Sequence, residues 1–254
     1  MKISIITVSY NSASVIKDCL DSVKKQKYGD IEHIIIDGAS TDGTLSILES
    51  KRKQLSALIS EPDEGIYYAM NKGIKIATGD IIGFLNSDDF YPSENVLSRV
   101  AKVFNDNPNI DGCYSDLIYT NKIDISINKR YWKSNKFSLG LFAKGWCPPH
   151  QTFFVRSSVY KKYGTFNIKY KIAADVELMM RFLEVYKINV CYISDLWVKM
   201  RLGGTTNKNI RNIFIQNREI LHALKTHKLS HNWISFFVFK FISRALQFLI
   251  KLDK

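Results

Sequence analysis

Acidic side chains closely follow several apolar segments in the N-terminal part of the sequence. Asp37 comes directly after His33–Ile36, and the pair Asp88 and Asp89 follows Ile81–Leu85. Neighbouring carboxylates that leave a buried strand repel each other unless one is well solvated or a cation lies between them. Mg²⁺ and Mn²⁺ prefer oxygen ligands of this kind. We therefore expect these residues to line a crevice that binds a divalent cation, or a ligand bridged by one.

Helix capping is the alternative explanation for some of these acids. Aspartate is common at helix N-caps, and Asp88 and Asp89 precede Pro92–Ser93, where a helix is expected to begin. Ser40–Asp42 can cap a helix in the same way. Capping does not explain an acid directly after an apolar strand, so Asp37 is the more informative residue.

Motifs of several other site types are absent from the sequence. The chain has no G-x-G-x-x-G dinucleotide loop, no G-K dipeptide for a P-loop, no H-E-x-x-H and no G-x-S-x-G. His227 and His231 have helical spacing, but no acid lies near them in the sequence. We do not expect a metal site at these histidines.

Short apolar runs alternate with amphipathic stretches, which predicts βαβ units with right-handed crossovers and a parallel sheet. The expected strands are Lys2–Val8, Ile31–Ile36, Leu55–Ser60 and Ile81–Leu85, and the expected helices are Ser14–Lys25, Thr44–Arg52, Ile66–Ala77 and Ser93–Asn105. Later elements are strands at Gly112–Tyr119, Gln151–Arg156 and Val190–Ile193 and a helix at Ala174–Tyr186. Ligands bind outside the carboxyl ends of such strands, where the acids lie.

Most of the net positive charge lies in the C-terminal fifth of the chain. Residues 201–254 contain ten basic and two acidic residues and so carry eight of the twelve net positive charges. We expect residues 1–199 to form one α/β domain and residues 200–254 to form a basic helical tail. In Trp233–Leu252 the polar side chains fall on one narrow helical stripe, and almost all others are bulky and apolar. The stripe consists of Lys240, Ser243, Arg244, Gln247 and Lys251.

A basic stripe beside a wide aromatic face is typical of a helix in the interface of an anionic membrane. Packing against the domain or in a dimer is the alternative. Nucleic acid is not an expected partner, because the aromatic residues form an apolar face and do not alternate with the basic ones.

The composition indicates an ordinary globular protein, with 46% hydrophobic and 24% charged residues. The four cysteines lie far apart, so neither a zinc cluster nor a disulfide framework is expected. No apolar run reaches the roughly 18–20 residues of a spanning helix, and Met1–Val8 leaves no room for a signal peptide. We expect a cytoplasmic protein that is peripheral on the inner face of the plasma membrane.

Three segments taken together resemble family-2 glycosyltransferases of the GT-A fold. They are Ile5–Asn11 (IITVSYN), Asp37–Thr44 (DGASTDGT) and Gly79–Asp89 (GDIIGFLNSDD), and the resemblance continues to Ala173–Asp175. It covers about residues 1–200, and the tail lies outside it. The resemblance implies a GT-A (Rossmann-like) α/β fold with a mostly parallel mixed sheet flanked by helices. It also implies a nucleotide-sugar donor, a divalent metal and inversion at the anomeric carbon.

The resemblance also implies roles for individual residues of the donor site. The loop after the first strand, including Val8 and Tyr10, holds the nucleotide base, and Asp37 contacts the nucleoside. Asp88 lies near the ribose or the donor sugar, and Asp89 binds Mn²⁺ or Mg²⁺.

On the acceptor side, Asp175 matches the catalytic base, which takes the proton of the attacking hydroxyl. A helix N-cap is the alternative role for Asp175, and Glu177 is a second candidate base. His150 and Gln151 could line the acceptor site.

The sequence departs from the family pattern at two positions. Gly38 stands where many members have a second acid, and Asn86 replaces the first acid of the D-x-D motif. The identity of the nucleotide base in the donor therefore stays open, and we favour a UDP-sugar. The Q-x-x-R-W motif of processive synthases is absent, which favours the addition of one sugar.

We expect an inverting, non-processive transferase that moves one sugar to a lipid-linked glycan in the assembly of a surface polysaccharide, such as lipopolysaccharide O-antigen or capsule. The alternative is a non-catalytic, nucleotide-binding, membrane-associated scaffold. The sequence contains all three acids, Asp88, Asp89 and Asp175. This argues against the alternative, because an inactive protein has no need of all three.

Overall fold

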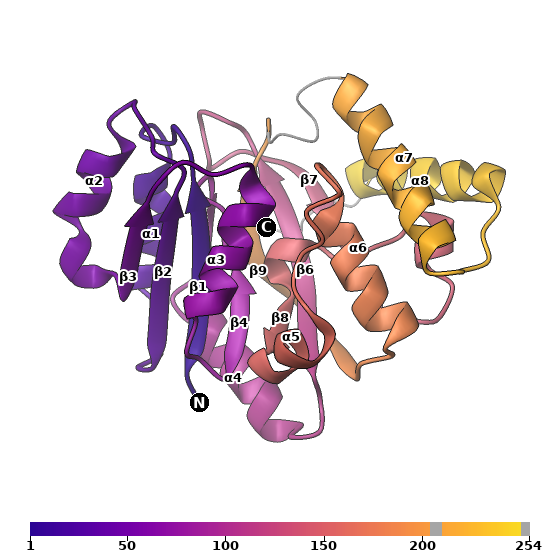
Figure 1. Ribbon diagram of the computed structural model, residues 1–254, viewed down its shortest axis with the longest axis horizontal. Coiled ribbons are helices and arrows are strands. Elements are labelled where there is room, and N and C mark those ends of the chain that lie inside the picture. The colour runs from indigo at the N-terminus through magenta and orange to yellow at the C-terminus, as the bar shows by residue number, and fades with distance from the viewer. Residues whose placement is uncertain (204–209, 250–254) are drawn as a thin grey trace.

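A computed structural model describes residues 1–203 and 210–249 of the chain. Its centre is a mixed nine-stranded sheet with the order β3-β2-β1-β4-β8-β6-β9-β5, in which β7 also pairs with β6 (Figure 1). The strands are β1 (Ile3–Ser9), β2 (Ile31–Asp37), β3 (Ala57–Ser60), β4 (Ile81–Phe84), β5 (Asp89–Phe90), β6 (Gly112–Thr120), β7 (Asn128–Trp132), β8 (Phe154–Arg156) and β9 (Val190–Arg201). The helices are α1 (Ile16–Lys24), α2 (Thr44–Ser50), α3 (Ile66–Ile76), α4 (Val96–Asp106), α5 (Ser157–Tyr163), α6 (Ala174–Met180), α7 (Ile210–Thr226) and α8 (Trp233–Leu249).

The N-terminal half of the sheet is parallel, as the alternation of strands and helices predicts. β1 pairs with β2 and β4, and β2 pairs with β3, all in parallel. Side chains of β1 alternate between the two faces of the sheet: Ile3 and Ile5 belong to one buried cluster, and Ile6 and Val8 to another. The expected mixed α/β architecture is confirmed.

Helices cover both faces of this sheet (Figure 1). Buried residues of α3, α5 and α6 share one core cluster, and those of α1 and α4 pack in the cluster on the other side. Because β1, β2 and β4 are parallel neighbours, their carboxyl ends meet at one edge of the sheet.

Three of the strands and α-helices were not predicted from the sequence, namely β5, β7 and α5, whereas α7 lies in the segment where a helical tail was expected. In addition, β9 continues to Arg201 and does not end near Ile193, because it pairs with β6 along most of its length. The expected helix Ala174–Tyr186 is α6 followed by a π-helical turn over Arg181–Val185. These features depend on pairing between distant segments, which local periodicity does not report.

The C-terminal helices pack against the sheet domain beside α6 (Figure 1). Ile220, Ala223 and Leu224 of α7 and Phe236 of α8 belong to the same buried cluster as α6. The expected boundary at Lys199 falls inside β9, and the division into a domain of residues 1–199 and a helical tail of residues 200–254 stays a prediction. No helix in residues 1–203 and 210–249 combines the length and apolar character needed to cross a bilayer.

Glu32 joins strands β1 and β2 to the segment before β4. Its carboxylate accepts hydrogen bonds from the Ser4 hydroxyl (2.5 Å), the Lys2 ammonium (3.0 Å), and the Thr78 backbone N–H (2.8 Å) and hydroxyl (2.6 Å). Burial alone would raise the pKa of Glu32, but these donors outweigh it and lower the pKa from 4.5 to about 2.

The first prediction concerns the acid stability that this carboxylate confers. A group whose pKa is lower in the folded state stabilises the fold above its unfolded pKa, and the contribution is lost as the pH falls through the folded value. We expect the free energy of unfolding, measured by urea titration, to fall between pH 4.5 and about 2 less steeply in Glu32→Gln than in the unmodified chain. Glu49→Gln, at an exposed position, should keep the full slope. Equal slopes for the Glu32 variant and the unmodified chain would contradict this role.

Candidate active site

Asp37 is buried at the end of β2, and its carboxylate accepts four hydrogen bonds. Oδ1 accepts from the hydroxyls of Ser9 (2.8 Å) and Ser40 (2.6 Å), while Oδ2 accepts from the Ser40 backbone N–H (2.9 Å) and the Ser60 hydroxyl (2.7 Å). Burial raises the pKa of Asp37, but these donors together hold it below its usual value. The ionised carboxylate ties together the carboxyl ends of β1, β2 and β3.

The segments after β1 and β2 form one hydrogen-bonded unit. The Asn11 backbone N–H donates to the Ser40 hydroxyl (2.8 Å), and the Asn11 side-chain oxygen accepts from the Thr41 N–H (2.9 Å). The Tyr10 side chain is 68% exposed and lies against Gly38, where a Cβ atom would come within 3.3 Å of the ring. Val8, in contrast, is buried in β1. Of the two expected nucleotide contacts, only Tyr10 presents a side chain to solvent.

Hydrogen bonds also join this unit to the segment that carries the acid pair. The Ser12 and Ser87 hydroxyls lie 2.9 Å apart. Arg201, at the end of β9, donates to the backbone carbonyl oxygen of Asp88 (2.8 Å) and to the carboxylate of Asp18. In the sequence, Arg201 stands out only as one of the basic residues of the tail. The long pairing of β9 with β6 is what brings it to the acid pair.

Asp89 is the first residue of β5 and is fully buried. Neither of its carboxylate oxygens accepts a hydrogen bond of ordinary geometry from the described residues, although Asn86 and Gln151 lie close enough to lower its pKa. Burial, followed by the charge of Asp88, raises the pKa of Asp89 well above its usual value, and Arg201 opposes this rise. Asp88 is half-buried, and burial raises its pKa as well.

A buried carboxylate that lacks hydrogen-bond partners fits the role of a cation ligand, because such a group is otherwise costly. Within residues 1–203 and 210–249, no three His, Cys, Asp or Glu side chains form a set that could hold a metal ion without other ligands. Mg²⁺ is commonly held by one or two carboxylates together with water and substrate phosphates. The residues present fit a cation that is shared with a phosphate-bearing ligand.

Asp175 is the second residue of α6 and lines a pocket of about 230 Å³. The Tyr67 hydroxyl lies 3.1 Å from Asp175 Oδ1 and 2.9 Å from the Ile172 carbonyl oxygen, and it can donate to either. The N-cap residue of α6 is Ala173, so the structure does not support the alternative in which Asp175 is the cap. The second candidate base, Glu177, is only 2% exposed and does not line the pocket.

His150 and Gln151 connect the acid pair to this pocket. Both residues line it together with Asp175, and Gln151 also lies close to Asp89. Burial lowers the pKa of His150, so its imidazole is neutral at pH 7. Gln151 and the Ser12–Ser87 contact link the three predicted acidic positions, of which only Asp175 lines the pocket.

Helix α8 forms one wall of the pocket. The α8 residues that line the pocket are Lys240, Ser243, Arg244 and Gln247, and all four belong to the predicted polar stripe. The sequence predicts that the stripe contacts an anionic membrane, but its described residues line the pocket, where Lys240 Nζ lies 2.7 Å from the Asn217 side-chain oxygen. Lys251, the last residue of the stripe, lies outside the described residues. Phe236 of α8 is buried, but many of the other apolar side chains of this helix are exposed, including Trp233 (64%) and Phe241 (76%).

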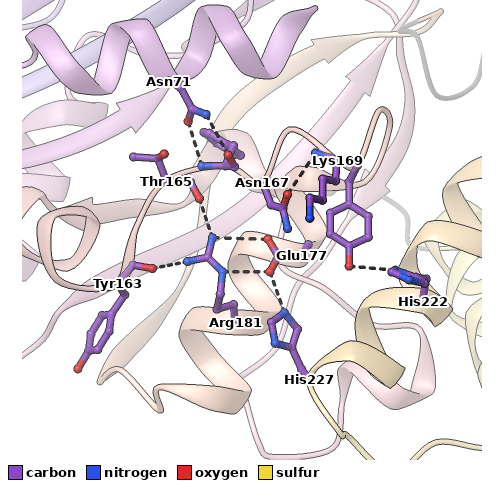
Figure 2. Close-up of polar contacts among 11 residues, drawn as sticks. Asn71, Tyr163, Thr165, Asn167, Lys169, Glu177, Arg181, His222 and His227 are labelled. Carbon is purple, nitrogen blue, oxygen red and sulfur yellow. Dashed lines mark hydrogen bonds and ion pairs between the residues drawn. The ribbon is translucent and has the colours of Figure 1, made fainter.

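The tail helix α7 holds the segment that carries Asp175. Glu219 accepts hydrogen bonds from three consecutive backbone N–H groups, those of Lys171, Ile172 and Ala173, each at 2.9 Å. Figure 2 shows a second link, in which buried Glu177 accepts from Arg181 (3.0 Å) and lies 2.7 Å from His227, the residue that directly follows α7. No sequence motif marks Glu219, and its isolation as one of two acids in a basic tail was the only available signal.

The second prediction concerns the hydrogen bonds by which Glu219 holds the segment that carries Asp175. Hydrogen bonds to a charged group are worth about 1.5–3 kcal/mol each, so we expect Glu219→Ala to lower the free energy of unfolding by a few kcal/mol. Because a small displacement of a catalytic group can cost about 10²-fold in rate, its kcat should fall at least about tenfold with unchanged nucleotide affinity. Arg218→Ala, at the exposed neighbouring position, is the control. Chemical denaturation and steady-state kinetics give both values, and unaltered stability with unaltered kcat would contradict the role of Glu219.

Comparison with known proteins matches this chain to glycosyltransferases, both by a family model and by individual relatives. Residues 4–168 match the family model described as "Glycosyl transferase family 2". A "PGL/p-HBAD biosynthesis glycosyltransferase" of Mycobacterium bovis is 34% identical over 181 residues, which cover 70% of this chain and 68% of that relative. An uncharacterized glycosyltransferase of Nostoc sp. is 29% identical over 186 residues, covering 69% of this chain and 57% of the relative.

Solved structures show the same fold at lower sequence identity. TarS of S. aureus (residues 1–349), in complex with UDP-GlcNAc, superposes with a TM-score of 0.68 at 20% identity and covers 91% of this chain and 68% of that one. The mannosyltransferase PcManGT of Pyrobaculum calidifontis, in complex with GDP-Man and Mn²⁺, gives a TM-score of 0.65 at 18% identity, with 99% and 76% covered.

Proposed function

Because the chain belongs to glycosyl transferase family 2 and has a GT-A fold, we propose that it moves one sugar from a nucleotide-sugar donor to an acceptor hydroxyl, with inversion and with the help of a divalent cation. The glycosyltransferase class follows from the family match, and the stereochemistry, the cation and the acceptor are our proposal. The observation that carries it is the series of side-chain contacts that links Asp37, the pair Asp88 and Asp89, and the pocket lined by Asp175.

The donor nucleotide binds at the carboxyl ends of β1, β2 and β4 in this proposal. Tyr10 offers an exposed aromatic ring for the base. Asp37 shapes the loop that carries Tyr10, and a direct contact with the nucleoside would replace one of its four hydrogen bonds. We favour a UDP-sugar, as the UDP-GlcNAc complex of TarS supports, and a GDP-sugar is the second donor to test because PcManGT binds GDP-Man.

Asp89 and Asp88 are the residues that would hold the cation. When bound there, it would neutralise the negative charge that develops on the leaving nucleoside diphosphate. Arg201 keeps this acidic segment in place through the Asp88 carbonyl oxygen. The Mn²⁺ in the PcManGT complex supports a cation in this fold.

Asp175 acts as the general base of the reaction. Its carboxylate lines the pocket, where it can accept the proton of the acceptor hydroxyl as that oxygen attacks the anomeric carbon on the face opposite the nucleotide. The Tyr67 hydroxyl orients the carboxylate, and α6 and α7 hold its backbone. The new glycosidic bond forms as the bond to the diphosphate breaks.

The test is an assay of the full chain with UDP-GlcNAc, UDP-glucose and GDP-mannose, in Mn²⁺ or in EDTA. Donor hydrolysis or transfer that depends on Mn²⁺ supports the proposed enzyme. Binding of UDP without any donor cleavage would instead support the alternative of a non-catalytic scaffold.

We propose a lipid-linked glycan at an anionic membrane surface as the acceptor, in surface polysaccharide assembly of the O-antigen or capsule kind. The support is the row of exposed apolar side chains on α8, opposite the face that lines the pocket. With the basic stripe in the pocket, this apolar face is the part of α8 that would enter the lipid interface.

The third prediction tests that face. Burial of a Phe side chain is worth about 1.5–3 kcal/mol, so Phe241→Glu should weaken binding to phosphatidylglycerol vesicles at least about tenfold, and removal of residues 231–254 should abolish it. Phe214→Glu, the same change at an exposed position of α7 (69%), is the matched control and should bind as the unmodified chain does. Vesicle co-sedimentation measures both. Unchanged binding of Phe241→Glu would point to a packing or dimer surface.

A further inference from the structure

Two cationic side chains of α8 line the same pocket as Asp175. Lys240 and Arg244 are separated by one helical turn and so lie on the same side of the helix. Arg130 and Lys133 also line the pocket, whereas Asp175 is the only carboxylate among its described lining residues. The pocket therefore carries an excess of positive charge.

Lys240 is the most informative of these residues because its ammonium is buried. The residue is 9% exposed, its Nζ donates to the Asn217 side-chain oxygen at 2.7 Å, and it forms no ion pair with a carboxylate of the described residues. Burial, helped by the charge of Arg244, lowers the pKa of Lys240 from 10.5 to about 8. A buried charge with only a neutral partner is costly, and an anion in the pocket would offset that cost.

The backbone around Gly145 holds Lys240 in this position. Gly145 has a φ of +73°, and a Cβ atom there would lie 2.8 Å from Lys240 Cβ and 3.1 Å from the Phe236 carbonyl oxygen. Phe236, one turn before Lys240, is fully buried in the core cluster of α6. Close packing on both sides therefore directs Lys240 into the pocket.

We propose that Lys240 and Arg244 form a subsite for a phosphate group of the acceptor, in the same pocket as the base Asp175. This inference rests on the proposed function and names the chemical class of its acceptor. Ammonium and guanidinium groups are the usual partners of phosphate, and the indole rings of Trp132 and Trp146 line the same pocket as apolar walls for a sugar. A phosphate between sugar and lipid would bind one face of α8 while the lipid meets the other.

The experiment measures binding and needs no turnover, so its failure is distinguishable from a failure of the proposed transferase activity. Phenyl phosphate is titrated calorimetrically into the full chain in EDTA, with phenyl glucoside as the neutral counterpart, and UDP is titrated separately with Mn²⁺. The variants are Lys240→Met, which keeps the apolar stem, and Arg244→Gln. Lys225→Met, at an exposed position of α7, is the matched control for the loss of one charge.

Loss of a hydrogen bond to a charged group costs about 1.5–3 kcal/mol, which corresponds to a factor of about ten or more in Kd. We expect that weakening for phenyl phosphate in both variants, with phenyl glucoside, UDP and phosphatidylglycerol vesicles bound as before. Unchanged phenyl phosphate binding would overturn the proposal. An equal loss of UDP affinity would assign these cations to the donor diphosphate, and a loss of vesicle binding alone would assign them to lipid headgroups; either outcome would also overturn it.

Discussion

Replacing Asp175 by asparagine should lower kcat by about 10²- to 10⁴-fold, the range that general base catalysis contributes. Asparagine has the same shape and can still accept from the Tyr67 hydroxyl, so the fold and the pocket should persist. The side chain loses only the ability to take a proton from the acceptor hydroxyl. Steady-state kinetics with the donor identified in the panel assay, together with UDP binding by calorimetry, separates the chemical step from donor binding.

Two further variants define what this result means. Tyr67→Phe removes the hydrogen bond that orients Asp175 and should cause a smaller fall in kcat, because the base itself remains. Glu177→Gln alters the buried pair with Arg181 and His227 (Figure 2) and should act mainly on stability. An Asp175→Asn variant with wild-type kcat, or a Glu177→Gln variant that is fully stable yet inactive, would refute the assignment of the base.

Replacing Asp89 by asparagine should change activity and stability in opposite directions. The carboxylate is fully buried, and the described residues give it no hydrogen bond of ordinary geometry, so its charge is costly when no cation is bound. An uncharged amide removes that cost, and each kcal/mol recovered raises Tm by about 2–4 °C in a chain of this size. A metal contribution of several kcal/mol to the transition state corresponds to a loss of activity of about 10²-fold or more.

The measurements are Tm in EDTA and transferase activity across a Mn²⁺ titration. Asp88→Asn is the matched variant, because the neighbouring carboxylate is half-buried and its removal should relieve less of the burial cost. Loss of Mn²⁺ dependence in only one of the two variants would identify the principal ligand. Full activity of Asp89→Asn, or turnover by the unmodified chain that is independent of metal, would rule out the proposed metal role of Asp89.

Local patterns in the sequence were enough to predict the parallel half of the sheet. Strands β1, β2 and β4 are rich in apolar residues because both of their faces are buried, and parallel pairing places their carboxyl ends at one edge. The positions of Asp37, Asp88 and Asp89 at that edge follow from chain order alone. Their roles toward the nucleotide and the cation stay predictions.

Only the tertiary structure revealed how the remaining chain completes the site. Helical periodicity showed that Lys240 and Arg244 share a face of α8, but periodicity cannot say whether that face meets lipid, solvent or a pocket. Glu219 binds the backbone of Ala173, which lies 46 positions earlier in the sequence. Arg201 binds the backbone of Asp88, which lies 113 positions earlier. Such contacts arise when distant elements pack together, because the free energy that holds them belongs to the assembled core and leaves no local mark on the sequence.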